Sequence, residues 1–484
     1  MVYESLRDQR TAGNEVMKVQ DKKCDRYRRH GIMDHAMTSR LLRDVVYPIY
    51  QMKKGLSFSS KVTEILPEIE RTERMSRDGL RDYQSRKLRR LIKHAYENVQ
   101  YYYEIMKERG LVPQDIKTIE DIKLLPVLTK EQVKKNRLKL IARDYRGRKV
   151  FHATTGGSTG EPLEYLRDFE TLAWTEASAL RGMSWAGYQL GALTVDLMSP
   201  NWPSFLGKVR GRLLNYHYFP AFAQDRNMIE HLVQITNLSP FCLIGFASNL
   251  YRIAKMSAMN NLDELKPPVI FSTAEILYDF QRSFIEEQFL CTVHDYYGCN
   301  EVGTIAHECD EHSKHVSAER LIVETTDFDG KYVNEGLGQI TVTDLHNYAM
   351  PFIRYINGDA GMISEKACLC GRTLPVIARL EGRTQDVIKT PDGNNIYSIF
   401  FPTCFRELRG IKQYQIVQND LHSITMMIVK NEAFSSRELD GVLKILREAV
   451  GEGVRIDVEE CPSIPKTSLG KTRLVISHVP TNKV

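Results

Sequence analysis

The segment HATTGGSTGEP, from His152 to Pro162, has the residue types of a phosphate-binding loop. Its three glycines and four hydroxyl side chains give a flexible backbone whose amide groups can converge on phosphate oxygens. It is not a Walker loop, because Glu161 follows the last glycine, where that motif requires lysine. On its own the segment could equally be an ordinary turn, so the prediction of a phosphate-binding loop depends on the rest of the chain.

Four further motifs with acidic, amide and basic side chains follow this segment. They are YYGCNEVG at 296–303, YINGDAG at 355–361, LEGRTQDVIK at 380–389 and IPKTSLGKTR at 464–473. Each carboxylate or lysine in them, taken alone, is most simply a loop or surface residue. Their joint order along the chain favours a common site.

In these five motifs the chain resembles the adenylate-forming superfamily, and within it the branch of phenylacetate–CoA ligases and capsular-polysaccharide CapK-like proteins. The resemblance extends from about Leu88 to the C-terminus and includes the segment DIKTIEDIKLLPVLTKEQVKKN. It implies an α/β fold with a large N-terminal domain of mainly parallel sheets and helices, and a small, mobile C-terminal α+β domain. It also implies an ATP-dependent, AMP-forming ligase that adenylates an aryl acid, releases pyrophosphate and passes the acyl group to coenzyme A.

The resemblance gives a role to the residues expected around the nucleotide. Ala274 and Glu275 are expected to lie along the adenine, and Tyr297, which precedes Gly298, is expected to stack on the purine. The residues expected to hold the β- and γ-phosphates of ATP are Thr155, Gly156, Gly157, Ser158, Thr159 and Gly160.

The same resemblance implies that Glu301 and Lys471 are the catalytic residues. Asn300 is expected to contact the α-phosphate, Glu301 to bind Mg²⁺, and Lys471 to bridge the acid and the α-phosphate. Asp359 is expected to accept hydrogen bonds from the ribose hydroxyls, with Arg383 supporting the same nucleotide. These residue types suit the reaction, because a carboxylate that attacks a phosphate accumulates negative charge that a magnesium ion and an ammonium group can offset.

Two other functions remain open. The first keeps the adenylation step but transfers the acyl group to an amine or hydroxyl acceptor in polysaccharide or antibiotic biosynthesis, and the long segment ahead of Leu88 favours it. The second is a nucleotide-binding protein that has lost catalysis. The chain also departs from the family at Glu161, and at Gln385, where the family often has a hinge aspartate and Asp386 stands next to it.

A separate group of residues has metal-ligand chemistry: Cys309, His315, Cys368 and Cys370. Two close pairs are compatible with a tetrahedral structural zinc, and spacing alone also allows unliganded reduced cysteines. The positions resemble a Cys-His-Cys-Cys set in the phenylacetate–CoA ligase branch, which favours Zn²⁺. His307 and His312 are competing ligands, and Cys299, beside the expected nucleotide loop, has no family role as a nucleophile.

The composition limits the class of protein. A formal net charge of +5 over 484 residues is too even for a nucleic-acid-coating protein. No run approaches the roughly 18 apolar residues of a membrane span. The polar N-terminus and nine scattered cysteines predict a reduced, cytoplasmic protein without a secretory signal. The expected partners are a small-molecule carboxylic acid and an acyl acceptor, and a homodimer is possible.

The elements that must position these residues follow from the apolar pattern. A helix is predicted through 88–99, and capping boxes at Thr118 and Thr129 open two more. Strands at 192–198, 241–247, 267–275 and 291–298 alternate with helices at 225–235 and 279–289, which predicts a parallel sheet with ligands at the carboxyl ends of its strands. The acid pocket is expected around 245–249, Tyr296 and Tyr297.

The last hundred residues are predicted to form a separate ββαβ unit. It comprises strands at 413–420 and 421–429, a helix from Ser435 or Ser436, and a strand at 454–460. The predicted organisation is a leader and helical extension at 1–80, a large AMP-binding domain at 81–384 and a small domain at 385–484.

Overall fold

The structure is a computed structural model. It describes residues 56–145, 150–154, 163–198, 207, 209, 211–212, 215–220, 225–327, 329–334, 336–383, 387–392, 395–397, 400–401, 410–432, 434–465 and 473–479. By its internal contacts the chain divides into two compact units. In its described part the first unit contains residues up to Thr63, Ala179–Tyr296 and Glu308–His312, and the second contains Glu64–Ser178, Tyr297–His307 and the residues from Ser313 onward. The predicted boundaries at 80 and 384 stay predictions.

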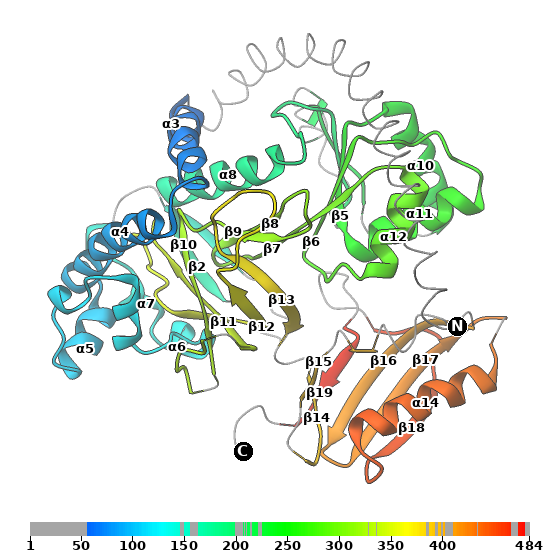
Figure 1. The fold of residues 1–484 in the computed structure, drawn as a ribbon. Helices are drawn as coiled ribbons and strands as arrows, with labels where there is room; N and C mark the ends of the chain where they lie inside the picture. Colours follow the sequence, from blue (N-terminus) through cyan, green and yellow to red (C-terminus); the bar gives the residue numbers. More distant parts are fainter. Residues whose placement is uncertain are drawn as a thin grey trace. The chain divides into compact units, whose positions relative to one another are not determined.

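The first unit is built on parallel strands, as the alternating pattern predicted. Their order is β4-β3-β5-β6-β7, and every pairing given for them is parallel. Side chains such as Val195, Leu243 and Ile270 are buried in one apolar cluster with side chains from the helices of this unit. Figure 1 shows α10, α11 and α12 beside these strands. The strands are β3 (Thr194–Asp196), β4 (Tyr216–Tyr218), β5 (Cys242–Phe246), β6 (Val269–Thr273) and the first part of β7 (Val293–Cys299), and the helices are α10 (Asp225–Leu238), α11 (Ala247–Met259) and α12 (Asp279–Phe289).

The second unit begins with helices. In α4 (Arg77–Asn98), Leu88, Leu91 and Ile92 are fully buried, which confirms the predicted apolar face. The capping box at Thr129 is present, since Thr129 N donates to Gln132 Oε1 at 2.7 Å and Gln132 N donates to Thr129 Oγ1 at 3.2 Å. The helix opened by Thr118 is a 3₁₀ helix. The other helices here are α3 (Leu56–Thr72, which the unit division crosses), α5 (Gln100–Glu108), η2 (Pro113–Asp115), η3 (Ile119–Leu124), α6 (Lys130–Lys135), α7 (Arg137–Leu140) and η4 (Arg143–Tyr145).

The sheet of the second unit is antiparallel in the pairings given for β9 to β13, which the sequence did not predict. Its strand order is β10-β11-β12-β13-β9-β8-β7. A separate antiparallel pair, β1 with β2, leads into α8 (Phe169–Ser184). The strands are β1 (Val150–Thr154), β2 (Glu164–Asp168), β8 (Gly303–Glu308), β9 (Lys314–Val316), β10 (Leu321–Thr326), β11 (Gly338–Asp344), β12 (Tyr355–Ser364) and β13 (Val376–Arg383).

The C-terminal part has the predicted ββαβ order, and in its described residues it also has β19 and a separate antiparallel pair, β14 with β15. Its sheet has the order β18-β17-β16-β19, in which short β19 pairs parallel with β16. Ile416, Met426 and Leu446 are buried between this sheet and its helix. The elements are β14 (Val387–Lys389), β15 (Asn395–Tyr397), β16 (Ile411–Asp420), β17 (Ser423–Lys430), α14 (Ser436–Val450), β18 (Arg455–Glu460) and β19 (Val475–Ser477).

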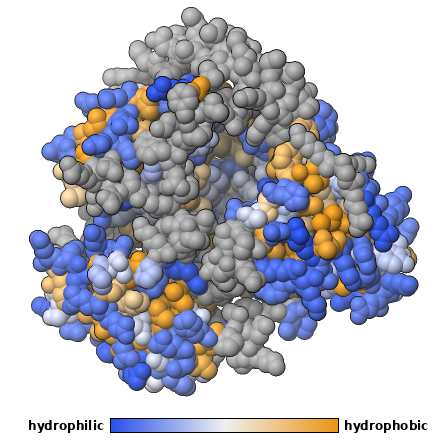
Figure 2. Space-filling model, turned by 180° about the vertical axis from the view of Figure 1, so that it is seen from behind, coloured by the Kyte–Doolittle hydropathy of each residue, from blue (hydrophilic) through white to orange (hydrophobic). Residues whose placement is uncertain are grey.

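The described surface is largely polar on the face seen from behind (Figure 2). Among the helices that the structure describes, none is long and apolar enough to cross a membrane. The fold is thus a mixed α/β fold with a large sheet-rich N-terminal part and a smaller C-terminal α+β part, as predicted.

Candidate functional site

A hydrogen-bonded network surrounds the carboxylate of Asp359. Tyr297, on β7, donates to Asp359 Oδ2 at 2.6 Å, and Asn357 Nδ2 donates to the Tyr297 hydroxyl oxygen at 2.6 Å. Arg383 Nε lies 3.1 Å from the other oxygen, Asp359 Oδ1. Asp359 and Arg383 stand directly opposite each other on β12 and β13. The network therefore brings together three residues that the sequence analysis assigned to one nucleotide: Tyr297, Asp359 and Arg383.

Electrostatics keep the Tyr297 hydroxyl protonated and the Arg383 guanidinium charged near neutral pH. Burial, together with the neighbouring carboxylate of Asp359, raises the pKa of Tyr297 well above its ordinary value. The same carboxylate raises the pKa of Arg383, so the guanidinium stays charged. Tyr297 thus remains a hydrogen-bond donor, and Asp359 is held from both sides.

The turn between β7 and β8 carries Glu301. Its side chain is only 8% exposed, and Tyr355 donates to Glu301 Oε1 at 3.0 Å, which orients the carboxylate. Asn300 has an exposed side chain, while its carbonyl oxygen accepts from the Tyr165 hydroxyl and from Arg167. The turn is therefore fixed by contacts with β12 and β2.

Gly298 has a steric reason to be glycine. A Cβ atom at this position would lie 2.6 Å from the carbonyl oxygen of Gly303, at the start of β8. Contacts that short do not occur, so a larger residue would push β7 and β8 apart. Gly298 is required for the turn that carries Glu301, and its role at the nucleotide stays a prediction.

Ala274 and Glu275 lie in the first unit, directly after β6. Ala274 has a φ of 63°, a conformation that costs a non-glycine residue on the order of 1–3 kcal/mol. Glu275 Oε2 accepts a 2.9 Å hydrogen bond from the backbone amide of Ser248, in the first turn of α11, the helix after β5. The segment predicted to lie along the adenine is thus a strained turn at the carboxyl ends of two parallel strands.

Several predicted site residues lie outside the described part of the chain. Within the β1–β2 connection they are Thr155, Gly156, Gly157, Ser158, Thr159, Gly160 and Glu161, and in the C-terminal part they are Gln385, Asp386 and Lys471. Their roles stay predictions.

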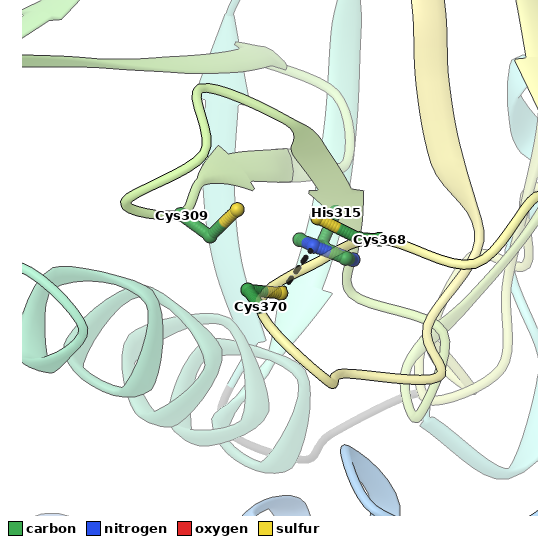
Figure 3. A group of neighbouring side chains, drawn as sticks. All are labelled: Cys309, His315, Cys368 and Cys370. Carbon is green, nitrogen blue, oxygen red and sulfur yellow. Dashed lines mark hydrogen bonds between the residues drawn. The ribbon is translucent and has the colours of Figure 1, made fainter.

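The four proposed metal ligands come together. Their ligand atoms all lie within 4.8 Å of one another, and the residues are Cys309, His315, Cys368 and Cys370 (Figure 3). Cys309 lies in the turn after β8, His315 on β9, and Cys368 and Cys370 in the loop between β12 and β13. Tetrahedral ligands about 2.3 Å from zinc are separated by about 3.8 Å, so the group has a suitable size for this ion.

The environment of His315 also fits metal binding. Its Nδ1 lies 3.1 Å from the carbonyl oxygen of Leu374, to which it can only donate. That contact leaves Nε2, 3.2 Å from Cys370 Sγ, as the unprotonated nitrogen of the neutral ring. The competing His312 instead contacts Arg282 through Nδ1 at 3.1 Å, and neither it nor His307 belongs to the group.

The sequence analysis missed some residues of the site. Asn357 and Tyr355 belong to a motif that was singled out for Asp359 alone, and their alternation along β12 was the available signal. Tyr165 and Arg167 follow the glycine-rich segment on β2, and nothing local to them indicated a contact with Asn300. Burial, with the nearby Glu301, raises the pKa of the Cys299 thiol and disfavours the thiolate, which would be the nucleophilic form.

Comparison with known proteins gives consistent matches. The family model described as the CapK C-terminal domain matches residues 388–478. "Protein CapK" of Staphylococcus aureus is 24% identical over 412 residues, which cover 83% of this chain and 90% of the relative. "Phenylacetate-coenzyme A ligase" of Thermus thermophilus is 25% identical over 444 residues, which cover 84% of this chain and 98% of the relative.

A solved structure shows the same fold. The structure of 2-hydroxyisobutyryl-CoA ligase, in the postadenylation state in complex with 2-HIB-AMP, matches with a TM-score of 0.67 and 20% identity, and the match covers 84% of this chain and 91% of that one. The resemblance drawn from the motifs is confirmed: residues 388–478 match the CapK C-terminal domain, CapK and the phenylacetate–CoA ligases are homologues of the chain, and the chain has the fold of 2-hydroxyisobutyryl-CoA ligase.

Proposed function

We propose that the chain is an ATP-dependent ligase that adenylates a carboxylic acid, releases pyrophosphate and passes the acyl group to coenzyme A. The observation that carries the proposal is the fixed Asp359 carboxylate, held by Tyr297 on one oxygen and by Arg383 on the other. A buried, oriented carboxylate can accept both hydroxyls of a ribose. Glu301 lies on the turn that directly follows the strand of Tyr297.

In the proposed first step, a carboxylate oxygen of the acid attacks the α-phosphorus of ATP. The bond from that phosphorus to the bridging oxygen breaks, and pyrophosphate leaves with the electron pair. Glu301 would bind the magnesium ion that offsets the charge of the phosphates, and Lys471 would neutralise the acid and the α-phosphate. In the second step the thiol of coenzyme A attacks the acyl carbon, loses its proton, and AMP leaves.

We also propose that the group of Cys309, His315, Cys368 and Cys370 binds one structural Zn²⁺. All four positions carry zinc-type ligands, and the hydrogen bond from His315 Nδ1 to a backbone carbonyl is the usual support of a metal-bound imidazole. A closed set of four protein ligands leaves no open position for substrate. The ion would join the turn after β8 to the loop between β12 and β13.

The first experiment is acid-dependent ATP–pyrophosphate exchange over a panel of aryl and aliphatic acids, with coenzyme A withheld. Exchange with one class of acid, lost in Glu301→Gln, supports the adenylation step and identifies the acid. Exposed Glu459, on β18, gives a matched control as Glu459→Gln. Binding of Mg·ATP without exchange for any acid would favour a nucleotide-binding protein that has lost catalysis.

A second candidate has the same first step but transfers the acyl group to an amine or hydroxyl. The observation that favours it is the match of residues 388–478 to the CapK C-terminal domain. The small domain of this fold is the part expected to move between the two steps, so its family bears on the acceptor used in the second step. Adding coenzyme A after the exchange assay separates the candidates. Coenzyme A consumption supports the thioester product, and an adenylate that coenzyme A does not capture supports the other acceptor.

A further inference from the structure

Several side chains donate hydrogen bonds to backbone carbonyl groups of the turn that carries Glu301. The carbonyl oxygen of Asn300 accepts from Tyr165 and Arg167, as described above. On the far side of Glu301, one guanidinium holds two more carbonyls: Arg320 donates to Val302 O at 2.7 Å and to Thr304 O at 2.5 Å. The backbone is thus fixed on both sides of the carboxylate.

Arg320 is a buried charge with a buried partner. Its side chain is fully inaccessible, and its guanidinium lies 3.3 Å from Asp344 Oδ2, on a carboxylate only 1% exposed. The other oxygen of Asp344 accepts from the backbone amide of His346 at 3.0 Å. The carboxylate is therefore an anchor that sets the position of the guanidinium.

A buried ion pair of this kind contributes little net stability, because removing two charges from water offsets most of their attraction. Apolar residues of the same size often serve as well for stability alone. The planar guanidinium offers something that an apolar side chain lacks, namely several donors in a fixed plane that reach two carbonyl groups at once. Its position points to a role in the conformation of the turn.

The residue between the two held carbonyls is Gly303, which has a φ of 75°. A Cβ atom at Gly303 would lie 2.5 Å from Cγ2 of Thr175, so the backbone here is packed as well as hydrogen-bonded. Val302, whose carbonyl Arg320 holds, directly follows Glu301 in the chain and is 1% exposed. Loss of the contacts from Arg320 would therefore let the turn, and with it the Glu301 carboxylate, change direction.

We propose that Arg320 is a positioning residue: anchored by Asp344, it holds the carbonyls of Val302 and Thr304 and so fixes Glu301 where the magnesium ion of Mg·ATP is bound. The proposal rests on the proposed function, because it requires Glu301 to serve that ion.

The test compares two buried arginines. Arg354 is a matched control, since it is 2% exposed, pairs with Glu324 at 3.2 Å, and donates to the carbonyls of Leu125 and Gly330. Arg320→Lys and Arg354→Lys each keep the charge but lose the planar fork, and we expect both to lower the unfolding temperature. Only Arg320→Lys is expected to raise the Mg²⁺ concentration for half-maximal ATP–pyrophosphate exchange, by about tenfold or more, because small displacements of a positioning group reduce rates strongly.

A calorimetric titration of ATP at several Mg²⁺ concentrations, on the same full-length proteins, supplies a second readout that does not depend on exchange. In it, Arg320→Lys should weaken binding of Mg·ATP and leave binding of ATP without Mg²⁺ unchanged. Equal Mg²⁺ dependence in the wild type and folded Arg320→Lys, or equal shifts in both lysine variants, would overturn the proposal. If Arg320→Lys does not fold, Asp344→Asn takes its place, and we expect it to raise the Mg²⁺ concentration for half-maximal exchange by a smaller factor. An unchanged Mg²⁺ dependence in Asp344→Asn would also overturn the proposal.

The same titration separates this proposal from the proposed function. A wild type that shows no exchange with any acid, yet binds Mg·ATP, contradicts the ligase function. In that case the comparison of Mg·ATP binding between Arg320→Lys and Arg354→Lys alone decides the role of Arg320.

Discussion

Tyr297 and Asp359 are joined by a hydrogen bond of 2.6 Å between two side chains that are both less than 10% exposed. The bond fixes the direction of the carboxylate, and Arg383, on its other oxygen, fixes it again. Groups oriented before the ligand arrives lose little freedom when it binds. The Asp359 carboxylate is therefore preorganised for the ribose hydroxyls that we propose it accepts.

Removing the hydroxyl of Tyr297 should weaken nucleotide binding moderately. Tyr297→Phe keeps the ring but loses the hydrogen bond donated to Asp359 and the one accepted from Asn357. The loss of the bond to Asp359, about 1 kcal/mol, should raise KM for ATP roughly fivefold. Asp359→Asn loses a charged acceptor, and we expect a tenfold to hundredfold increase in the same KM, from about 1.5–3 kcal/mol. The measurement is the ATP dependence of the exchange reaction.

Tyr102→Phe is the control for Tyr297→Phe. Tyr102 is also buried, and its hydroxyl donates to the carbonyl of Pro351 at 2.9 Å. Its loss should lower stability but leave KM for ATP unchanged. Tyr297→Leu, which removes the ring as well, separates support of Asp359 from stacking: a KM equal to that of Tyr297→Phe would rule out a contribution from the ring.

Protein purified without chelator should contain about one zinc per chain, because all four ligands are present and suitably spaced. Elemental analysis measures this directly. Cys370→Ser should lose most of the metal, while Cys461→Ser, at a free cysteine of the C-terminal part, should keep it. Zinc-free wild-type protein, or equal zinc in both variants, would contradict the four-ligand site.

The metal group illustrates what the sequence could predict. Each pair of ligands was visible from its spacing, but the meeting of the pairs depends on the antiparallel contact of β9 with β13, where His315 stands opposite Val376. No pattern of residues in β9 or β13 predicts which residues of the two strands are paired. For the same reason His312 remained a competitor until its contacts with Arg282 and Glu308 were known.

The fold shows a similar division. In the first unit β3, β5, β6 and β7 are short apolar runs, so they were predicted within a few residues, whereas β4, with the sequence Tyr-His-Tyr, was not predicted. The strands of the second unit bury polar side chains such as Thr341, Thr343 and Asp344, which conceal the apolar pattern. Arg320 was missed for a similar reason. Most arginines lie at the surface, so the sequence does not show that this one is buried until its partner Asp344 is known.

Lys471 should be required for adenylation but not for binding ATP. Lys471→Ala removes the ammonium that offsets charge in the transition state, and we expect exchange to fall by about 10²–10³-fold. The dissociation constant for Mg·ATP should change little. Lys444→Ala, at an exposed position on α14, is the control. Exchange at the wild-type rate in Lys471→Ala would contradict the role given to this lysine.

His294 should make the protein less stable as the pH falls below neutrality. The ring is 4% exposed, and burial lowers its pKa to about 4, against about 6.5 in an unfolded chain. Above pH 6.5 neither state is protonated, so His294 has no effect on stability there. Between pH 6.5 and 4 the unfolded state binds a proton that the folded state does not, so the free energy of unfolding decreases by up to about 1.4 kcal/mol for each pH unit lost.

Urea unfolding at pH 7 and pH 5 measures this decrease. The free energy of unfolding should decrease less for His294→Gln than for the wild type, and His422→Gln, at an exposed position, should behave like the wild type. An identical decrease in His294→Gln and the wild type would show that His294 takes up its proton equally in both states.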